Sequence, residues 1–348
     1  MICIISVTKK GDIIADKIQD NLGGQVFKKS KSEKFNLNEV TKQGFEEYKY
    51  VIFISSTGIA VRAIAKFLKG KDVDPAVIVV DVCNNFTISL VSGHLGGANY
   101  LSNKIARILD NTPVITTATD NLEIEAPDMV ALNNNLIIDD LKIAKVIASR
   151  LVNEEEVYFY DDRDLITCPK GYVLKTEVSK NTLWITNKLF YDVDYYKKSL
   201  VKNLSALYRR DNILKLIRKD IVLGIGCRRN TDSKKLYDFV KAELEHNNID
   251  IRAVKKIASI DIKSDEDAIL NLAMNLQCDT KFFSKVEIAN IDSKYEGSDF
   301  VKQTVGVRAV SEPVVELLGA DIIKGKVKYE GITLTIGILK GWIIEGDE

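Results

Sequence analysis

His94 lies in a glycine-rich segment, residues 92–99, that could perform acid–base chemistry. The run before this segment is typical of a buried strand, and the apolar residues after it recur at the spacing of an amphipathic helix. A strand that turns through Gly93, Gly96 and Gly97 into a helix gathers backbone N–H groups and the positive helix end in one place. The imidazole is therefore a candidate general base, with the glycine amides as oxyanion donors. The alternative is a structural histidine that caps the turn.

Ser92 and Asn99 stand at the two ends of the same segment. Ser92 is a candidate nucleophile if a base activates it, but no third partner is evident in the sequence, and the alternative is an ordinary turn hydroxyl. Asn99 is a candidate substrate-binding residue. The other histidine, His246, follows a polar helix end, so a surface position is expected for it. His94 is thus the main candidate for imidazole chemistry.

Two other loops of the N-terminal third could contact an anion or contribute a carboxylate. One is a second strand-to-helix turn at residues 55–58, which has an arginine one helical turn later; its alternative is an ordinary capped helix. The other loop follows the strand-like run 113–117 and ends on an acidic residue. The candidates from these loops are Thr57, Gly58, Arg62, Thr116, Thr117 and Asp120, the last as a catalytic carboxylate.

A further candidate anion site lies in the C-terminal third, where a strand-like run ends in residues 226–231. Two arginines at a helix N-terminus could bind carboxylate or phosphate, and a thiol there would have a lowered pKa. The alternatives are a solvated arginine pair and a small buried thiol. The binding candidates are Gly226, Cys227, Arg228, Arg229 and Thr231, with Glu312 as a candidate carboxylate further along the chain.

The elements around these residues predict a multidomain α/β protein. Residues 1–120 alternate strand-like and helix-like runs, which predicts an N-terminal domain with a mostly parallel sheet between two helix layers. The loops at 55–58, 92–99 and 116–120 are expected to share one edge of that sheet. Residues 121–219 predict a small α+β middle region, whose residues 188–219 resemble a helical connector, and residues 220–348 predict a second α/β domain with Asn230 or Thr231 as a helix N-cap.

The composition narrows the functional class. The chain has 348 residues, 46% of them hydrophobic and 28% charged, with 49 basic and 49 acidic residues, so no basic excess suggests nucleic acid. Its apolar runs are of strand length, no membrane span is expected, and a cytoplasmic protein is predicted. The five cysteines are scattered, which argues against a disulfide framework or a zinc site. Since no glycine-rich nucleotide motif occurs, nucleotide binding has no motif to support it.

Three segments of the N-terminal third are distinctive: residues 71–77 (KDVDPAV), 89–99 (SLVSGHLGGAN) and 114–120 (VITTATD). They resemble the CbiG family of cobalamin biosynthesis. Residues 224–231 (GIGCRRNT) and 306–319 resemble the family's C-terminal domain, which is CobE-like. Residues 81–85 depart from the pattern, because an acidic residue near Cys83 and a glycine after it would be expected. That departure weakens a catalytic role for this loop.

The resemblance implies a cobalt-precorrin-5A hydrolase, which opens the ring-A lactone and releases the bridging carbon as acetaldehyde to give cobalt-precorrin-5B. It implies His94, with Asp120, as the base, the amides of Gly96 and Gly97 as oxyanion donors, and arginines for the substrate's carboxylates. Cobalt would arrive inside the polycarboxylate tetrapyrrole substrate, so no metal or other cofactor of the protein is expected. Other enzymes of the pathway could be partners, and a homodimer is compatible with the sequence. The alternatives are a non-catalytic tetrapyrrole carrier and an α/β enzyme with a phosphate ligand.

Overall fold

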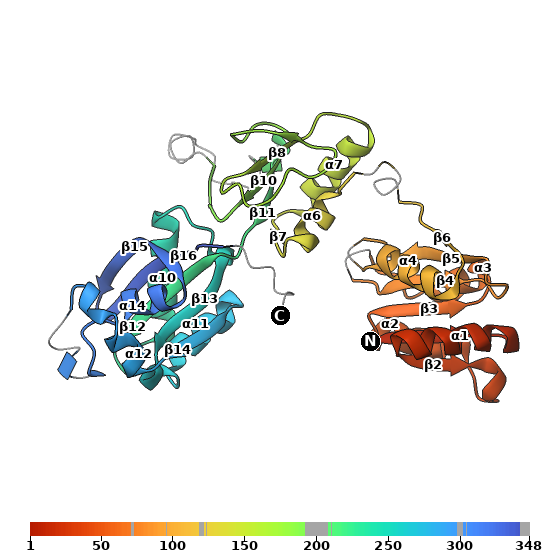
Figure 1. The fold of residues 1–348 in the computed structure, drawn as a ribbon, viewed down its shortest axis with the longest axis horizontal. Helices are drawn as coiled ribbons and strands as arrows, with labels where there is room; N and C mark the ends of the chain where they lie inside the picture. Colours follow the sequence, from red (N-terminus) through yellow and green to blue (C-terminus); the bar gives the residue numbers. More distant parts are fainter. Residues whose placement is uncertain are drawn as a thin grey trace. The chain divides into compact units, whose positions relative to one another are not determined.

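The computed structural model describes residues 1–348 except 71–72, 95, 118–121, 123, 192–207, 210, 298–301, 304 and 342–348. The chain forms two compact units (Figure 1). Unit 1 comprises Met1–Leu132 and Leu151–Glu155, and unit 2 comprises Asn133–Arg150 and Glu156–Glu348. The described residues contain three sheets, one in each of the three predicted segments. The middle and C-terminal sheets, however, belong to the same unit.

Unit 1 is built on a mixed sheet. Its strands, in order across the sheet, are β2 (Gln25–Lys28), β1 (Ile2–Ser6), β3 (Tyr50–Ile54), β4 (Ala76–Val80), β5 (Phe86–Val91) and β6 (Thr112–Val114). Neighbouring strands are parallel except β4 and β5, which are antiparallel. β4 is buried along its whole length, as expected of a strand covered on both faces.

Helices cover both faces of this sheet, which confirms the predicted three-layer α/β fold. The helices are α1 (Lys9–Leu22), α2 (Leu37–Glu47), α3 (Thr57–Ile64) and α4 (Ala98–Leu109). A further helix, α6 (Pro127–Asn133), follows later in the chain. Apolar side chains of α1 and α4 pack on one face with Ile4, Ile52 and Ile78, while α2 and α3 pack on the other. Alternate residues of each strand therefore enter two separate cores.

A hairpin between β4 and β5 reverses the direction of the sheet. The Asp81 carboxylate closes the hairpin by accepting hydrogen bonds from the backbone N–H groups of Cys83, Asn85 and Phe86 at 2.7–2.8 Å. The end of β5, Val91, consequently pairs with Val77 at the start of β4. The loops after β5 and β6 thus lie at the edge where β1, β3 and β4 begin.

The prediction that the loops at 55–58, 92–99 and 116–120 share one edge of the sheet is therefore wrong. Residues 55–58 follow the end of β3, because Ile54 pairs with Val80 at the end of β4. Residues 92–99 lie at the opposite edge, together with residues 116–117 after β6. The hairpin is the physical reason, since a connection as short as residues 81–85 can join only antiparallel strands.

Unit 2 contains the middle sheet and the C-terminal sheet. The middle sheet has the order β7 (Ile137–Ile138), β11 (Leu214–Ile217), β10 (Thr182–Thr186), β8 (Tyr158–Asp161) and β9 (Val173–Leu174), and α7 (Leu141–Val152) follows β7 in the chain. β11 is completely buried. A helical connector was predicted for residues 188–219, and this prediction is wrong for β11, whose four buried residues belong to the core of the sheet. Residues 192–207 and 210 lie outside the described residues.

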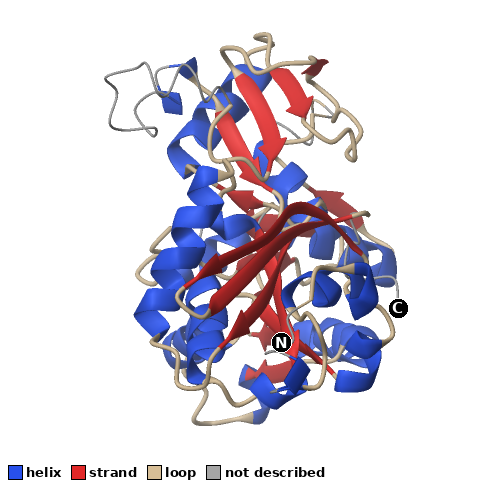
Figure 2. Cartoon of the chain, turned by 90° about the vertical axis from the view of Figure 1, so that its left-hand side faces the viewer, coloured by secondary structure: helices blue, strands red, loops and turns tan. Residues whose placement is uncertain are grey.

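The C-terminal sheet is flanked by helices on both sides (Figure 2). Its strands, in order, are β14 (Asp279–Phe283), β13 (Val254–Ile260), β12 (Ile221–Cys227), β16 (Ile332–Leu339) and β15 (Ala320–Tyr329), and its helices are α10 (Ser233–His246), α11 (Asp267–Leu276), α12 (Lys285–Ala289) and α14 (Ser311–Leu317). Asp232 caps α10 by accepting a bond from the Lys235 N–H. The predicted N-caps Asn230 and Thr231 are thus too early.

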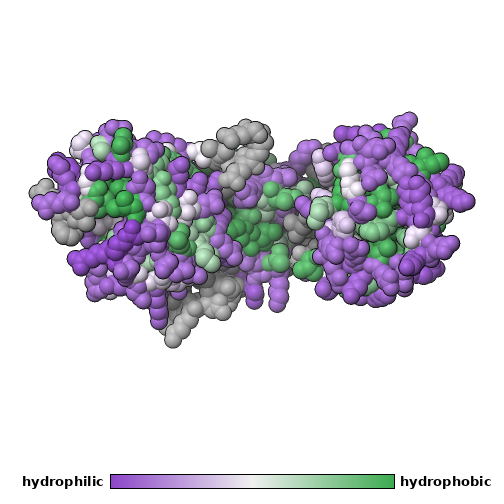
Figure 3. Space-filling model, turned by 90° about the horizontal axis from the view of Figure 1, so that it is seen from below, coloured by the Kyte–Doolittle hydropathy of each residue, from purple (hydrophilic) through white to green (hydrophobic). Residues whose placement is uncertain are grey.

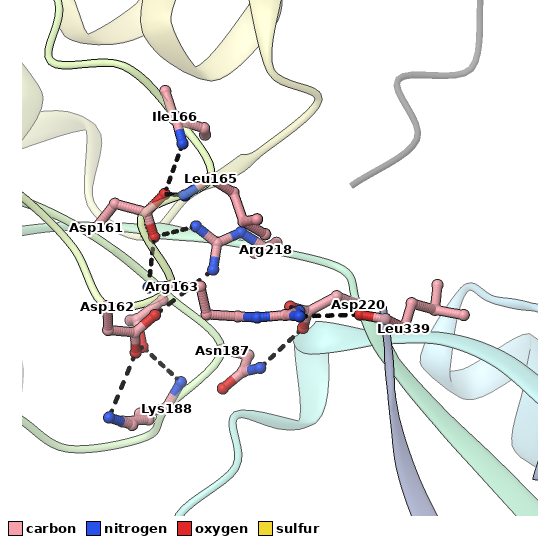
Figure 4. A network of polar contacts seen from close by, with 11 residues as sticks. Asp161, Asp162, Arg163, Leu165, Ile166, Asn187, Lys188, Arg218, Asp220 and Leu339 are labelled. Carbon is pink, nitrogen blue, oxygen red and sulfur yellow. Dashed lines mark hydrogen bonds and ion pairs between the residues drawn. The ribbon is translucent and has the colours of Figure 1, made fainter. Parts of the chain in front are cut away.

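A buried polar network joins the two sheets of unit 2 (Figure 4). The guanidinium of Arg218, which is fully buried, contacts the carboxylates of Asp161 and Asp162. Arg163 reaches from the middle sheet to Asp220 at 2.6 Å and to the carbonyl of Leu339 at 3.0 Å. Because buried charges are costly without partners, these contacts fix the sheets against each other.

The visible surface is mainly hydrophilic in Figure 3, with apolar residues in smaller groups between charged ones. This pattern agrees with the 28% of residues that are charged in the sequence. Among the residues that the structure describes, none forms a helix long and apolar enough to cross a membrane.

Candidate functional site

The His94 turn joins β5 to α4 through short backbone hydrogen bonds. The Gly97 N–H donates to the His94 carbonyl at 2.8 Å, and the Ala98 N–H donates to the Ser92 carbonyl at 3.1 Å. The predicted role of Gly97 as an oxyanion donor is therefore wrong, since its amide is already used. The Gly96 N–H has no acceptor in the described part of the chain and can still donate to a bound group.

Glycine is required in this turn because the chain folds back on itself. A Cβ on Gly96 would lie 2.4 Å from the Ser92 Cβ, and a Cβ on Gly93 would lie 2.7 Å from the Asn99 Oδ1. Gly97, at φ 85°, has the left-handed conformation that favours glycine. The glycines thus serve close packing as well as exposure of an amide.

Ser92 is committed to the structure of the turn. Its φ of 57° lies in the left-handed region, and its hydroxyl donates to the Asp74 carbonyl at 3.1 Å. No base among the described residues is arranged to accept the proton of this hydroxyl. The geometry favours a turn hydroxyl over the predicted nucleophile.

Asn99 holds three segments together beneath the turn. Its Oδ1 accepts from the Ser89 hydroxyl at 2.6 Å, and its Nδ2 donates to the Thr117 hydroxyl at 3.0 Å. Only 8% of Asn99 is exposed, so it supports the site from below more than it faces a ligand. Thr116 is exposed beside this contact, whereas the predicted catalytic Asp120 lies outside the described residues.

His94 faces a carboxylate that the sequence analysis missed. Its Nδ1 lies 3.7 Å from Oδ2 of Asp128, and the two side chains are 17% and 16% exposed. Asp128 lies in the first turn of α6, directly after Pro127. A proline followed by an acidic residue is a helix-start signal, which could have drawn attention to this position.

Tyr50, at the start of β3, also adjoins the turn. A Cβ on Gly97 would lie 3.3 Å from the Tyr50 hydroxyl oxygen. No sequence signal connects this tyrosine with the glycines, because only the direction of β5 brings the two together. The edge around His94 therefore carries an imidazole, a carboxylate, a phenol and the Gly96 amide.

Thr57, Gly58 and Arg62 lie at the opposite edge of the sheet. The Arg62 guanidinium folds back and donates to the Gly58 carbonyl at 3.3 Å. These residues cannot join the His94 turn in one site, since the length of β3 separates the two edges. The prediction that they share an edge with His94 is corrected accordingly.

The C-terminal candidates are largely engaged with protein groups. Arg229 pairs with Asp265 and donates to the Ile262 carbonyl at 2.6 Å. The Thr231 N–H donates to Glu266 at 3.0 Å. Burial raises the pKa of the Cys227 thiol, which contradicts the lowered pKa expected of a nucleophile.

Arg228 differs from its neighbour. It is exposed, its side chain lies against Gly331, and no carboxylate pairs with it among the described residues. Gly226 is held close to Thr333, whose hydroxyl donates to the Gly226 carbonyl at 3.2 Å. Glu312 lies 3.2 Å from the Lys326 ammonium, so its charge is already balanced. Arg228 is the member of this group that is placed to bind an external carboxylate.

No cluster of histidine, cysteine, aspartate and glutamate suited to a metal ion occurs within the described ranges. His246, the last residue of α10, is exposed as predicted.

Comparison with known proteins gives a consistent picture. The family models described as "Cobalamin synthesis G N-terminal" and "Cobalamin synthesis G C-terminus" match residues 39–120 and 221–337. The chain is 34% identical to a cobalt-precorrin-5A hydrolase from Salmonella typhimurium over 85% of this chain and 84% of that protein. It is 29% identical to a cobalt-precorrin-5A hydrolase from Priestia megaterium over 97% and 94%. A solved structure of CobE, from the cobalamin biosynthetic pathway, aligns with 34% of this chain and 89% of that one, at 22% identity and a TM-score of 0.33.

Proposed function

Because this chain belongs to the CbiG family of cobalt-precorrin-5A hydrolases, we propose that it hydrolyses cobalt-precorrin-5A. In this reaction water opens the ring-A lactone, and the bridging carbon leaves with its methyl group as acetaldehyde. The structural observation that carries the proposal is the His94 imidazole at one edge of the sheet of unit 1. It lies beside the Asp128 carboxylate, in the same turn as the Gly96 N–H, which has no acceptor among the described residues.

The proposed first step is the addition of water. His94 accepts a proton from water while the oxygen bonds to the lactone or to the bridging carbon. The negative charge that develops on oxygen is stabilised by the Gly96 N–H, an oriented donor that needs no reorganisation. Opening the lactone yields a free acetate side chain and a hydroxyl on the bridging carbon.

The second step breaks a carbon–carbon bond. The hydroxyl of the bridging carbon loses its proton and becomes the carbonyl of acetaldehyde. The electron pair of the broken bond remains on the macrocycle, and the conjugated ring system and its cobalt can accept it. Cobalt therefore enters as part of the substrate, and we assign the protein no cofactor of its own.

The substrate carries many carboxylates, which need cationic partners. Arg228 supports this part of the proposal, because it is exposed and pairs with no carboxylate among the described residues, and a guanidinium can bind an external carboxylate bidentately. Arg229 is a weaker candidate, because Asp265 already neutralises it.

The test is acetaldehyde release from cobalt-precorrin-5A by the purified chain. We expect His94→Ala to lower kcat by about 10²- to 10⁴-fold, the usual contribution of a general base. His246→Gln is the matched control, since this second histidine is exposed in unit 2, and its activity should equal that of the wild type. Full activity of the His94 variant would contradict the proposed role of the imidazole.

The same assay separates catalysis from transport. A tetrapyrrole carrier would bind the substrate and release no acetaldehyde at any enzyme concentration. The hydrolase names of the relatives support catalysis, and none of the described contacts favours the carrier or a phosphate ligand.

A further inference from the structure

The turn between β12 and α10 carries Arg228 and is held by a buried carboxylate. The Thr231 N–H donates to Oε1 of Glu266 at 3.0 Å, and the Thr231 hydroxyl donates to the Arg228 carbonyl at 2.8 Å. Asn230, between them, has a φ of 58°, in the left-handed region that few residues other than glycine and asparagine adopt. A backbone of this kind keeps its shape only where its surroundings hold it.

The Glu266 side chain is committed to this turn. Glu266 is the N-cap residue of α11, yet its side chain does not cap that helix. One carboxylate oxygen accepts from Thr231, and the other accepts from the Lys263 ammonium at 3.2 Å. Glu266 is 3% exposed and Lys263 is 7% exposed, so each charge needs the other as a partner. Lys263 thus fixes the carboxylate that holds the turn.

The turn places the Arg228 side chain at the surface. This side chain is exposed and lies against Gly331, where a Cβ would come within 2.9 Å of the Arg228 Nε. Its backbone is fixed by the bond from the Thr231 hydroxyl. An arginine that is already held in place loses less conformational freedom when it binds a carboxylate.

We infer that Glu266 is a positioning residue, which holds the turn 228–231 and so presents Arg228 to a carboxylate of the substrate. The inference rests on the proposed function, in which Arg228 binds such a carboxylate. Glu266 acts through the Thr231 N–H and takes no part in the transfer of protons. Its effect therefore belongs to binding, and not to the chemical steps.

Two double variants separate the contact with Thr231 from the buried charges. Lys263→Met/Glu266→Gln removes both charges and keeps an amide oxygen that can accept from the Thr231 N–H. Lys263→Met/Glu266→Leu removes both charges and the acceptor. Replacing a buried ion pair by apolar residues of similar volume is often neutral for stability, so both proteins should fold. Lys241→Met/Glu245→Leu, at an exposed pair of α10, is the matched control.

The first experiment measures amide hydrogen exchange of Thr231 in the full chain without substrate. In Lys263→Met/Glu266→Leu we expect exchange about tenfold faster than in the wild type, because a hydrogen bond to a charged acceptor is lost. Lys263→Met/Glu266→Gln should show a smaller change, and the control should show none. Equal exchange in the two double variants would overturn the inference. No substrate is needed, so the outcome does not depend on the proposed hydrolase function.

The second experiment measures turnover of cobalt-precorrin-5A. Lys263→Met/Glu266→Leu should raise KM by about 3- to 10-fold with kcat unchanged, since the turn must then be ordered on binding. Lys263→Met/Glu266→Gln should recover most of this loss. In an Arg228→Ala background the Leu double substitution should raise KM no further, because Glu266 acts only through Arg228. A further rise in that background, or a fall in kcat of the double variant, would overturn the inference.

The two experiments together distinguish this inference from the proposed function. If the exchange of Thr231 changes as expected while Arg228→Ala leaves KM unchanged, Glu266 does hold the turn, and it is the assigned binding role of Arg228 that fails.

Discussion

At the scale of a single residue, the contacts of Ser92 show whether it serves the structure of the turn or its chemistry. Its left-handed backbone conformation costs a non-glycine residue about 1 kcal/mol or more. Its hydroxyl compensates in part by donating to the Asp74 carbonyl. A residue held in this way serves the fold first.

We predict that Ser92→Gly retains acetaldehyde release within about threefold of the wild type, because glycine adopts the same backbone conformation without strain. The lost hydrogen bond and the relieved strain should leave stability nearly unchanged. Turnover and urea denaturation of the variant check both statements. A loss of 10³-fold or more, as expected for a nucleophile, would restore Ser92 to the catalytic residues.

The sequence predicted the place of His94 and missed its partner for a physical reason. Glycines between a strand and a helix produce a local signal, since their conformational freedom is needed within a few residues. The pairing of His94 with Asp128 depends on tertiary packing of α6, and no local pattern records which carboxylate an imidazole will meet. For the same reason Tyr50 could not be connected with the turn.

At the scale of elements, the β4–β5 hairpin decides which loops can form a site. The strand before the His94 turn was predictable from its apolar run, which the structure confirms as β5. The direction of β5 was predictable too, because a connection of residues 81–85 is too short for a parallel crossover. The alternation of strand-like and helix-like runs predicted a mostly parallel sheet, and the short loop adds the one antiparallel pair, β4 with β5.

The hairpin leads to a prediction about Arg62. Because Arg62 lies at the edge opposite to His94, Arg62→Ala should leave kcat and KM for cobalt-precorrin-5A within about twofold of the wild type, as for other surface substitutions. Steady-state acetaldehyde release measures both constants. A rise of KM by tenfold or more would mean that this edge also takes part in binding.

The buried ion pair of unit 2 predicts a pH dependence of stability. Burial alone would raise the pKa of Asp250, but its bonds to Arg252 and the charge of Lys215 outweigh burial and lower the pKa to about 2. An unfolded aspartate has a pKa of about 4. The stabilisation is therefore complete above pH 4 and is lost as the pH falls from about 4 to about 2.

Asp250→Asn should accordingly flatten the acid branch of the stability curve. The wild type should lose about 2–3 kcal/mol more than the variant between pH 5 and pH 2, the linkage value for such a shift. Urea denaturation at several pH values, followed by tryptophan fluorescence, measures the difference. Parallel curves for the two proteins would contradict the assigned pKa.

At the scale of the whole molecule, the two compact units predict two unfolding transitions. Each unit has its own buried core, Trp184 is buried in unit 2, and the residues of unit 1 include no tryptophan. Circular dichroism should therefore show two transitions in urea, and tryptophan fluorescence should follow only the transition of unit 2.

Arg218→Ala removes the buried partner of Asp161 and Asp162. It should lower the free energy of unfolding of unit 2 by about 3–5 kcal/mol and leave that of unit 1 unchanged. Lys340→Ala, at an exposed ion pair, is the control. Coincident transitions would contradict the division.

The sequence predicted three segments, and the structure has three sheets in two units. The C-terminal sheet begins at Ile221, and unit 1 extends to Leu132, past the boundary that local patterns place at residue 120. The union of the middle and C-terminal sheets could not be predicted from local patterns, because it depends on buried contacts such as those of Arg163, whose partners Asp220 and Leu339 are far along the chain. Charged residues at such an interface look in the sequence like ordinary surface residues.

The hairpin at residues 81–85 also provides a site for spectroscopy. Cys83 is exposed there, Cys3 is fully buried, and burial raises the pKa of each of the other four thiols, to about 12 for Cys3 and about 11 for Cys278. A maleimide dye at neutral pH should consequently couple to Cys83 first, since the thiolate is the reacting form. The dye would sit on the side of the sheet away from His94, where it could report on the protein during turnover without obstructing it.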